Sequence, residues 1–235
     1  MLKIGKNRVC ILNQPAGLGD ILFIIPIARM LIAEGSNVII PTDFGGLQKH
    51  FPDIVFLEKK TLNIDYDEKQ IVERCNSTVF PMRFADSLIK ADYRNCMAAK
   101  YRLFDLPLSL WRTVTWKRDM VLENDLYYNT LGLKDNSKYT LVNTKFTASD
   151  KHEITIDKKD KLPIVNMKVL SKYTLLDWGK VIENATNIHT VSTSLLYVLE
   201  IMDLTAEEVH IYKREPLELD HKYYDYLITK NFRLR

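Results

Sequence analysis

The sequence predicts an α/β fold made of two halves, each with a parallel sheet, and three observations support this prediction. Short apolar runs rich in β-branched residues alternate with apolar stretches of helical length. Strand, helix, strand, helix and strand follow one another within about fifty residues, which is typical of right-handed parallel crossovers. A polar, turn-prone segment at 133–138 (LKDNSK) then precedes a second series of the same kind. We therefore expect two domains, 1–134 and 135–235.

The first half begins with an almost continuous apolar run at 8–13 (RVCILN), which fits a strand buried on both faces. A helix is expected over 21–34, where Pro26 near the first turn can kink it and Gly35 supplies the stop. Further elements are predicted by short apolar runs or helical spacing: strands at 37–41, 54–57 and 77–82, and helices at 92–106 and 123–131.

The second half starts with an expected strand at 139–146. Thr174 and Asp177 have the spacing of a capping box ahead of a helix at 175–185. Further elements are predicted in the same way: strands at 162–167, 187–191 and 208–213, and a helix at 195–202. Because ligands of such sheets bind beyond the carboxyl ends of the strands, the loops directly after strands are the candidate sites.

The composition is that of an ordinary soluble globular protein, with 46% hydrophobic and 27% charged residues. The net charge of +3 is small and the basic residues are spread along the chain, so nucleic acid is not an expected partner. The three cysteines form no CxxC pair, which indicates a reducing, cytoplasmic location. The apolar stretch 21–33 is shorter than the roughly 20 residues of a membrane span, which leaves only peripheral membrane contact open.

The first candidate loop lies between the first strand and the first helix. Gly17 and Gly19 permit a sharp turn, but Leu22 replaces the third glycine of a dinucleotide-binding loop, and no Walker lysine is present. The glycines alone are also explained by a tight strand-to-helix turn. Asp20 could cap the helix, or it could act at the mouth of a cleft as general base toward an acceptor hydroxyl.

The second candidate loop, Ser192–Ser194, places three hydroxyls and free N–H groups at the start of a predicted helix. Such a terminus is a ready anion site that could hold a diphosphate, although one of the hydroxyls could simply cap the helix. His189 beside it could contact the donor or be a packed histidine. The five histidines show no ligand spacing, so no metal site is expected.

Other polar residues that follow expected strands are candidate contacts for a nucleotide ligand. A lysine could bind a phosphate, and a hydroxyl or amide could bind the rest of the nucleotide. The alternative is that these residues belong to ordinary polar loops. These residues are Asn143, Thr144, Lys145, Thr147, Ser171 and Lys172.

The segment LNQPAGLGDILFIIPIARMLIAEG resembles the opening of the heptosyltransferase-like glycosyltransferases of the GT-B fold, and the match falls on Gly19, Asp20 and Pro26. In that family the aspartate of the Gly-Asp pair is the proposed catalytic base, so the resemblance implies this role for Asp20. The resemblance also implies two Rossmann-like halves whose parallel sheets face a central cleft, the first on the acceptor side and the second on the nucleotide-sugar side.

The segment LLDWGKVIENATNIHTVSTSLLYVLEIM is similar to the part of these enzymes that carries an Asp-Thr-Gly-x-x-His loop beside the donor sugar. Here Ser192, Thr193, Ser194 and Tyr197 occupy those positions, so only the threonine is kept. The sugar and the nucleotide therefore stay undetermined.

The expected function is an inverting transfer of a sugar from a nucleotide-sugar donor to a glycan or other hydroxyl acceptor, without a metal or other cofactor. Asp20 is the expected base, and its neighbours on the acceptor side are Gly17, Leu18 and Gly19. Two other functions stay open: a non-catalytic nucleotide- or sugar-binding module, and another nucleotide-dependent α/β enzyme, an epimerase or oxidoreductase. An oxidoreductase is less favoured because Asp43 is the only obvious acidic ribose partner at the end of the second strand.

Overall fold

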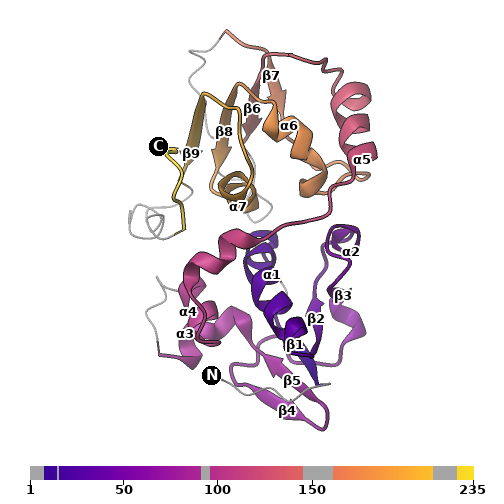
Figure 1. Cartoon of the computed structure of the whole chain (residues 1–235), viewed down its shortest axis with the longest axis vertical. Helices are drawn as coiled ribbons and strands as arrows, with labels where there is room; N and C mark the ends of the chain where they lie inside the picture. Colours follow the sequence, from indigo (N-terminus) through magenta and orange to yellow (C-terminus); the bar gives the residue numbers. More distant parts are fainter. Residues whose placement is uncertain (1–7, 15, 91–95, 145–160, 214–226) are drawn as a thin grey trace. The chain divides into compact units, whose positions relative to one another are not determined.

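The chain divides into two compact units, Met1–Lys117 and Arg118–Arg235, each with its own five-stranded sheet (Figure 1). The computed structural model describes residues 8–14, 16–90, 96–144, 161–213 and 227–235. The predicted boundary at 134/135 lies too late in the sequence compared with this division. The reason is packing: the helical segment from Met120 to Thr130 contacts the helices of the second unit.

The first sheet has the strand order β3-β2-β1-β5-β4. Four of its strands are parallel: β1 (Val9–Leu12), β2 (Asn37–Pro41), β3 (Val55–Leu57) and β5 (Ser77–Phe80). The edge strand β4 (Val72–Arg74) is antiparallel to β5 and was not predicted, because its sequence, VER, is short and polar. The carboxyl ends of β1, β2 and β3 therefore share one edge of the sheet.

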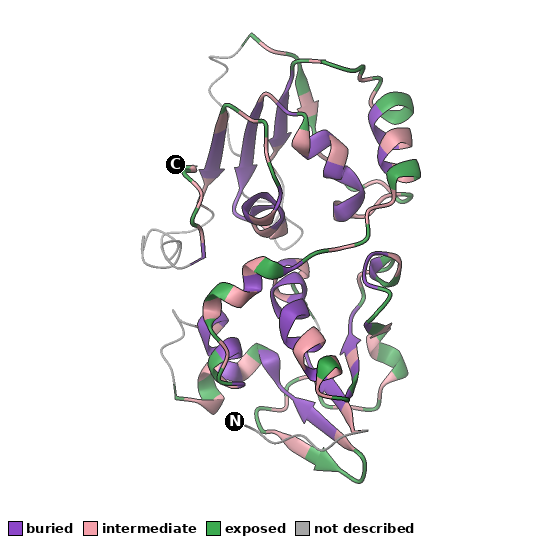
Figure 2. Cartoon of the chain, viewed as in Figure 1, coloured by how far each residue is buried: buried purple, intermediate pink, exposed green. Residues whose placement is uncertain are grey.

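Helix α1 (Leu18–Ala33) follows β1 and is buried along most of its length (Figure 2). Pro26 lies inside the helix and removes one backbone donor. In the turn before it, the Phe23 carbonyl accepts a hydrogen bond from the Tyr101 hydroxyl at 2.6 Å. The Phe23 ring also packs against Tyr101 and Trp111, with ring centroids 5.1 and 5.3 Å apart. Burial in this cluster holds an interrupted helix in place.

The other helical segments of the first unit are short. They are α2 (Leu47–His50), η1 (Lys59–Thr61), η2 (Met82–Phe84), α3 (Ala85–Leu88), α4 (Cys96–Arg102) and η4 (Leu108–Thr113). Among them α4 and η4 contact α1.

The second sheet has the order β10-β9-β8-β6-β7, and all of its described pairings are parallel. Its central strand β8 is buried at every position, although its sequence, NIHTV, includes polar residues (Figure 2). The strands are β6 (Thr140–Asn143), β7 (Ile164–Asn166), β8 (Asn187–Val191), β9 (Glu208–Tyr212) and β10 (Arg233–Leu234).

The helices of the second unit largely follow the prediction. The capping box is confirmed, with the Thr174 N–H donating to Asp177 Oδ2 at 2.7 Å. The segment predicted as one helix over 123–131 is instead an α-helix followed by a π-helix. The helical elements are α5 (Met120–Asn124), η5 (Asp125–Thr130), η6 (Leu175–Trp178), α6 (Gly179–Glu183) and α7 (Ser194–Ile201).

A buried carboxylate joins α5 to α6 in this unit. The Glu123 side chain is fully buried, pairs with Arg118 and accepts a hydrogen bond from the Lys180 N–H at 2.7 Å. A Cβ at Gly179 would lie 2.8 Å from Glu123 Oε2, so the glycine leaves room for the carboxylate. Glu123 also holds the pKa of the Arg118 guanidinium above its ordinary value.

We expect Glu123→Ala to destabilise the second unit by about 2 kcal/mol, because the Lys180 N–H loses its acceptor and the Arg118 guanidinium, which retains Glu183, loses one carboxylate partner. Urea unfolding followed by the fluorescence of Trp178, in a variant without the other two tryptophans, measures this loss. The control Glu207→Ala removes an exposed carboxylate of the same unit and should cost less than about 0.5 kcal/mol. Equal losses in the two variants would contradict the assigned role of Glu123.

Candidate active site

The loop between β1 and α1 is shaped by Gly17. Its backbone has φ 82°, a left-handed conformation that favours glycine. A Cβ built on Gly17 would lie only 2.4 Å from Oδ2 of Asp20. Glycine is therefore required at this position both by the backbone and by the space that the carboxylate occupies.

The Asp20 side chain lies in the first turn of α1 and is 37% exposed. Its Oδ1 accepts a hydrogen bond from Nζ of Lys100 at 2.5 Å. The N-cap position of α1 is Gly17, with no side-chain capping bond, so capping is not what the Asp20 carboxylate does. The carboxylate is held by a cation and is partly open to solvent.

Lys100, on α4, is a residue that sequence reasoning missed. Its side chain is only 3% exposed, and it reaches Asp20 from a position eighty residues away in the sequence. The available signal was a lysine inside the apolar segment CMAAKYR, whose other buried members are Met97, Ala98, Ala99 and Tyr101. A charged side chain in such a segment needs a partner, but the sequence does not say which one.

Two buried side-chain oxygens lie where β1 ends, next to the same loop. They are Oδ1 of Asn13 and Oε1 of Gln14, and neither has a hydrogen-bond partner among the described residues. The amide nitrogens of both side chains are used, by the carbonyls of Asp65 and Ala16. Buried acceptors usually find donors, so these two oxygens are polar groups whose donors the described residues do not supply.

A hollow of about 380 Å³ lies beyond the carboxyl ends of β2 and β3, on the same sheet edge as the Gly17 loop. It is lined by 42–48, 56–58 and Lys60. Asp43 in this hollow is paired with Lys59 at 2.5 Å. The one obvious acidic ribose partner is therefore already occupied, which counts against a dinucleotide at this edge.

In the second unit, Asn143 and Thr193 come together at the carboxyl ends of β6 and β8. The Asn143 amide donates to Oγ1 of Thr190 at 3.0 Å and to Oγ1 of Thr193 at 3.3 Å. Thr193 is the N-cap of α7, and its Oγ1 accepts from the Leu195 N–H at 3.3 Å. The capping interpretation thus holds for one of the three hydroxyls in this loop.

The neighbouring residues of that loop occupy different positions. Ser192 is buried, and its N–H extends the ladder to the Tyr212 carbonyl at 2.9 Å. Ser194 is half-buried in the first turn of α7, and Thr144 is half-buried directly after β6. Two further candidates, Lys145 and Thr147, lie outside the described residues.

Ser171 and Lys172 are exposed in the loop after β7. Lys172 forms an ion pair with Asp125, which also accepts from the Tyr173 hydroxyl at 2.6 Å. Asn129, Lys172 and Tyr173 together hold the pKa of Asp125 well below its ordinary value. A phosphate bound by Lys172 would have to compete with this carboxylate, and the predicted contact stays a prediction.

His189 lies inside β8 and is 7% exposed. Its ring stacks on that of His210, with centroids 4.4 Å apart and an interplanar angle of 3°, and its Nδ1 lies 2.9 Å from the Tyr212 hydroxyl. This geometry fits the packed-histidine alternative better than a contact with the donor.

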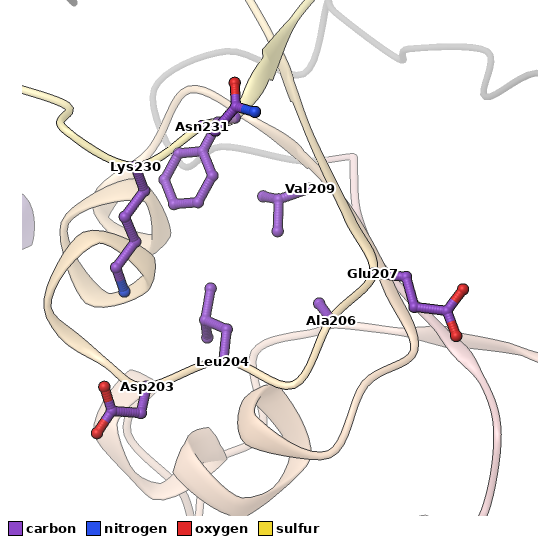
Figure 3. A pocket seen from close by; sticks show the side chains of 8 residues that line it. Asp203, Leu204, Ala206, Glu207, Val209, Lys230 and Asn231 are labelled. Atoms are coloured by element: carbon purple, nitrogen blue, oxygen red, sulfur yellow. The ribbon is translucent and has the colours of Figure 1, made fainter.

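A second hollow, of about 320 Å³, lies at the opposite edge of the second sheet, where β9 begins (Figure 3). Lys230 points along one side of it and donates to the Leu199 carbonyl at 2.9 Å and to the Met202 carbonyl. Since β9 begins at this hollow, the hollow lies at the amino ends of the strands. It also lies beside the C-terminus of α7, and the C-terminus of a helix disfavours anions. Its lining residues are Asp203, Leu204, Ala206, Glu207, Val209, Lys230, Asn231 and Phe232.

No group of three or more histidine, cysteine or acidic side chains in the described part of the chain is placed to hold a metal ion. Of the helices described, none has the length and apolar character needed to cross a lipid bilayer.

No model of a known protein family matches the sequence, and no curated protein matches it significantly. Solved structures do match. One is the iron-containing dodecameric glycosyltransferase TibC of enterotoxigenic E. coli H10407, with 11% identity and a TM-score of 0.55 over 90% of this chain. Another is a family 9 glycosyl transferase of Veillonella parvula DSM 2008, with 11% identity and a TM-score of 0.53 over 98% of this chain and 86% of that one.

TibC has also been solved in complex with ADP-D-beta-D-heptose, and that structure matches with a TM-score of 0.54 at 11% identity. This chain spans only 59% of the TibC chain. At these identities the likeness establishes the fold. The predicted α/β fold of two Rossmann-like units with parallel-dominated sheets, as in heptosyltransferase-like GT-B proteins, is confirmed.

One expectation is contradicted. The sequence, with its resemblance, led us to expect that no metal is required, but TibC, which shares the fold, is described as iron-containing. The expectation failed because neither the fold nor the spacing of the five histidines determines whether a protein contains a metal.

We expect Gly17→Ala to destabilise the first unit by more than the roughly 1 kcal/mol that a left-handed alanine costs, because its Cβ also displaces the Asp20 carboxylate. The matched control is Gly132→Ala, which has φ 65° and nothing within 4 Å of the added Cβ. Urea unfolding of each unit, followed by its own tryptophans, gives both losses. A Gly17 loss no larger than that of Gly132 would show that Asp20 does not need the space.

Proposed function

We propose that this chain is an inverting glycosyltransferase that moves a sugar from a nucleotide-sugar donor to an acceptor hydroxyl, with Asp20 as general base. The observation that carries the proposal is the partly exposed Asp20 carboxylate, fixed by Lys100 at the carboxyl edge of the first sheet. The glycosyltransferase fold of the structural neighbours supports the enzyme class.

In the proposed reaction the acceptor oxygen attacks the anomeric carbon of the donor sugar. The bond from that carbon to the diphosphate oxygen breaks, and the nucleoside diphosphate leaves with the electron pair. The hydroxyl proton moves to Asp20, whose Oδ1 is engaged by Lys100 and whose Oδ2 lies above Gly17. General-base assistance of this kind contributes about 10²–10⁴-fold to the rate.

We assign the departing diphosphate to the second unit. Ser192, Thr193 and Ser194 lie at the N-terminus of α7, where N–H groups and the helix dipole favour an anion. Asn143 already bonds the capping threonine, which fixes the loop that would receive the ligand. The complex of TibC with ADP-D-beta-D-heptose supports a nucleotide-sugar as the donor class.

The acceptor, a glycan or another hydroxyl compound, is assigned to the first unit. The hollow beyond β2 and β3 and the unsatisfied oxygens of Asn13 and Gln14 lie on the edge that carries Asp20. Oxygen acceptors at this edge suit hydroxyl donors and are poor partners for a phosphate. The three cysteines are unpaired, and we keep a reducing, cytoplasmic location as part of the proposal.

We expect Asp20→Asn to lower kcat by about 10²–10⁴-fold with little change in donor affinity, because the amide cannot take the proton. Transfer is measured with candidate nucleotide-sugars and a glycan acceptor. The control Glu73→Gln changes an exposed carboxylate on the edge strand β4 and should leave turnover unchanged. Near wild-type turnover of the Asp20 variant would remove this residue from the catalytic role.

The second candidate function is a non-catalytic nucleotide- or sugar-binding module. It is favoured by one observation: of the family's Asp-Thr-Gly-x-x-His loop only Thr193 is kept, and its hydroxyl is used as a helix cap. A thermal-shift screen of nucleoside diphosphates and their sugars separates the two functions. A donor at 100 times its Kd stabilises the native state by about 2.7 kcal/mol. Binding with neither transfer nor donor hydrolysis would favour the module.

A further inference from the structure

Helix α4 holds the start of α1 through two adjacent residues. Lys100 bonds the Asp20 carboxylate at 2.5 Å, and Tyr101 bonds the Phe23 carbonyl at 2.6 Å. Both side chains are almost fully buried, and burial raises the pKa of Tyr101. The first two turns of α1 are thus fixed against α4 by one charged and one neutral contact.

The cost of burying a lysine shows that this pairing is not incidental. An ammonium with 3% of its side chain exposed is unfavourable unless it is paired. The partner here is a carboxylate that is itself 37% exposed, so one end of the pair is buried and the other faces solvent. A solvent-facing carboxylate without this anchor would be free to change rotamer.

The two carboxylate oxygens are in different environments. Oδ1 accepts a hydrogen bond from Lys100. Oδ2 lies 2.4 Å from the position that an ideal Cβ on residue 17 would take. One oxygen therefore anchors the group, and the other keeps the capacity to accept a proton.

We propose that Lys100 is a positioning residue: it holds Asp20 by Oδ1 so that Oδ2 faces the acceptor hydroxyl. The proposal rests on the proposed function, because it gives Lys100 a role that acts only through the base. Placement within about half an ångström matters for such a base, since small displacements lower the rate strongly.

The kinetic test compares Lys100→Met with Lys100→Arg. We expect the methionine variant to lower kcat at least 10-fold with a donor KM within 3-fold of wild type, and the arginine variant to restore part of kcat because it can still donate to Oδ1. In an Asp20→Asn background, Lys100→Met should cause no further loss, since both changes act on the same group. An equal loss in that background would overturn the proposal.

A second measurement does not depend on activity. Cys96 lies one turn before Lys100 on α4, and burial raises the pKa of its thiol. The Lys100 charge opposes this rise, while the carboxylates of Asp20 and Asp86 add to it. Cys96 therefore reports the charges of the pair through its reaction with iodoacetamide, which requires the thiolate.

The labelling experiment uses a Cys75→Ser background, because Cys75 is exposed whereas Cys10 is buried. Asp20→Asn should lower the pKa of Cys96 and speed labelling near pH 8, and Lys100→Met should raise it and slow labelling. Lys134→Met, an exposed change in the other unit, is the control and should have no effect. Unchanged labelling in both pair variants would overturn the proposed contact.

The two measurements separate the possible failures. Opposite labelling shifts with no transferase activity in the wild type would retain the Asp20–Lys100 contact and remove the proposed function. Transferase activity that depends on Asp20 but not on Lys100 would retain the function and remove the positioning role. Thermal unfolding of each variant identifies a loss of folding. If the methionine variant does not fold, kcat of the arginine variant tests the positioning role instead.

Discussion

The contact between Lys100 and Asp20 is the constraint that both the glycine loop and the packing of α4 on α1 must satisfy. It requires a left-handed glycine at position 17 to leave room for Oδ2. It also requires α4 to lie close enough to α1 for a lysine stem to be buried between them. The apolar packing of Phe23 with Tyr101 and Trp111 supplies that proximity. A polar contact at the edge of the sheet is therefore kept in place by a hydrophobic cluster behind it.

Local sequence pattern predicted the strands best where a single physical requirement dominates. Both β2 and β8 were predicted at their observed bounds, because a short run with β-branched residues between turn or helix signals has few alternatives. The pattern did not predict β4, whose polar VER sequence forms a strand only by pairing with β5. Nor did it predict the domain boundary, which depends on the packing of α5 on α6 and η6 through side chains such as Glu123.

The same distinction applies to the candidate site. The glycine loop and Asp20 were evident because they are adjacent in sequence. Lys100 was not, since its partner lies eighty positions away and only the fold brings the two together. In the second unit, Asn143 and Thr193 were each singled out, but their hydrogen bond depends on the pairing of β6 with β8. For His189, its position beside the Ser192–Ser194 loop suggested a ligand contact, whereas stacking on His210 uses the ring for packing.

The two units repeat one structural device with different chemistry. In each, a strand runs into a helix whose N-terminus lies at the carboxyl ends of the parallel strands. Such a terminus favours an anion in both cases. In α1 the first turn already contains the Asp20 carboxylate, which repels a second anion and can accept a proton. In α7 the corresponding positions are hydroxyls: Thr193 caps the helix by accepting from the Leu195 N–H, and the first turn contains no acidic residue. Under the proposed function, this difference is why we assign the base to the first unit and the leaving diphosphate to the second.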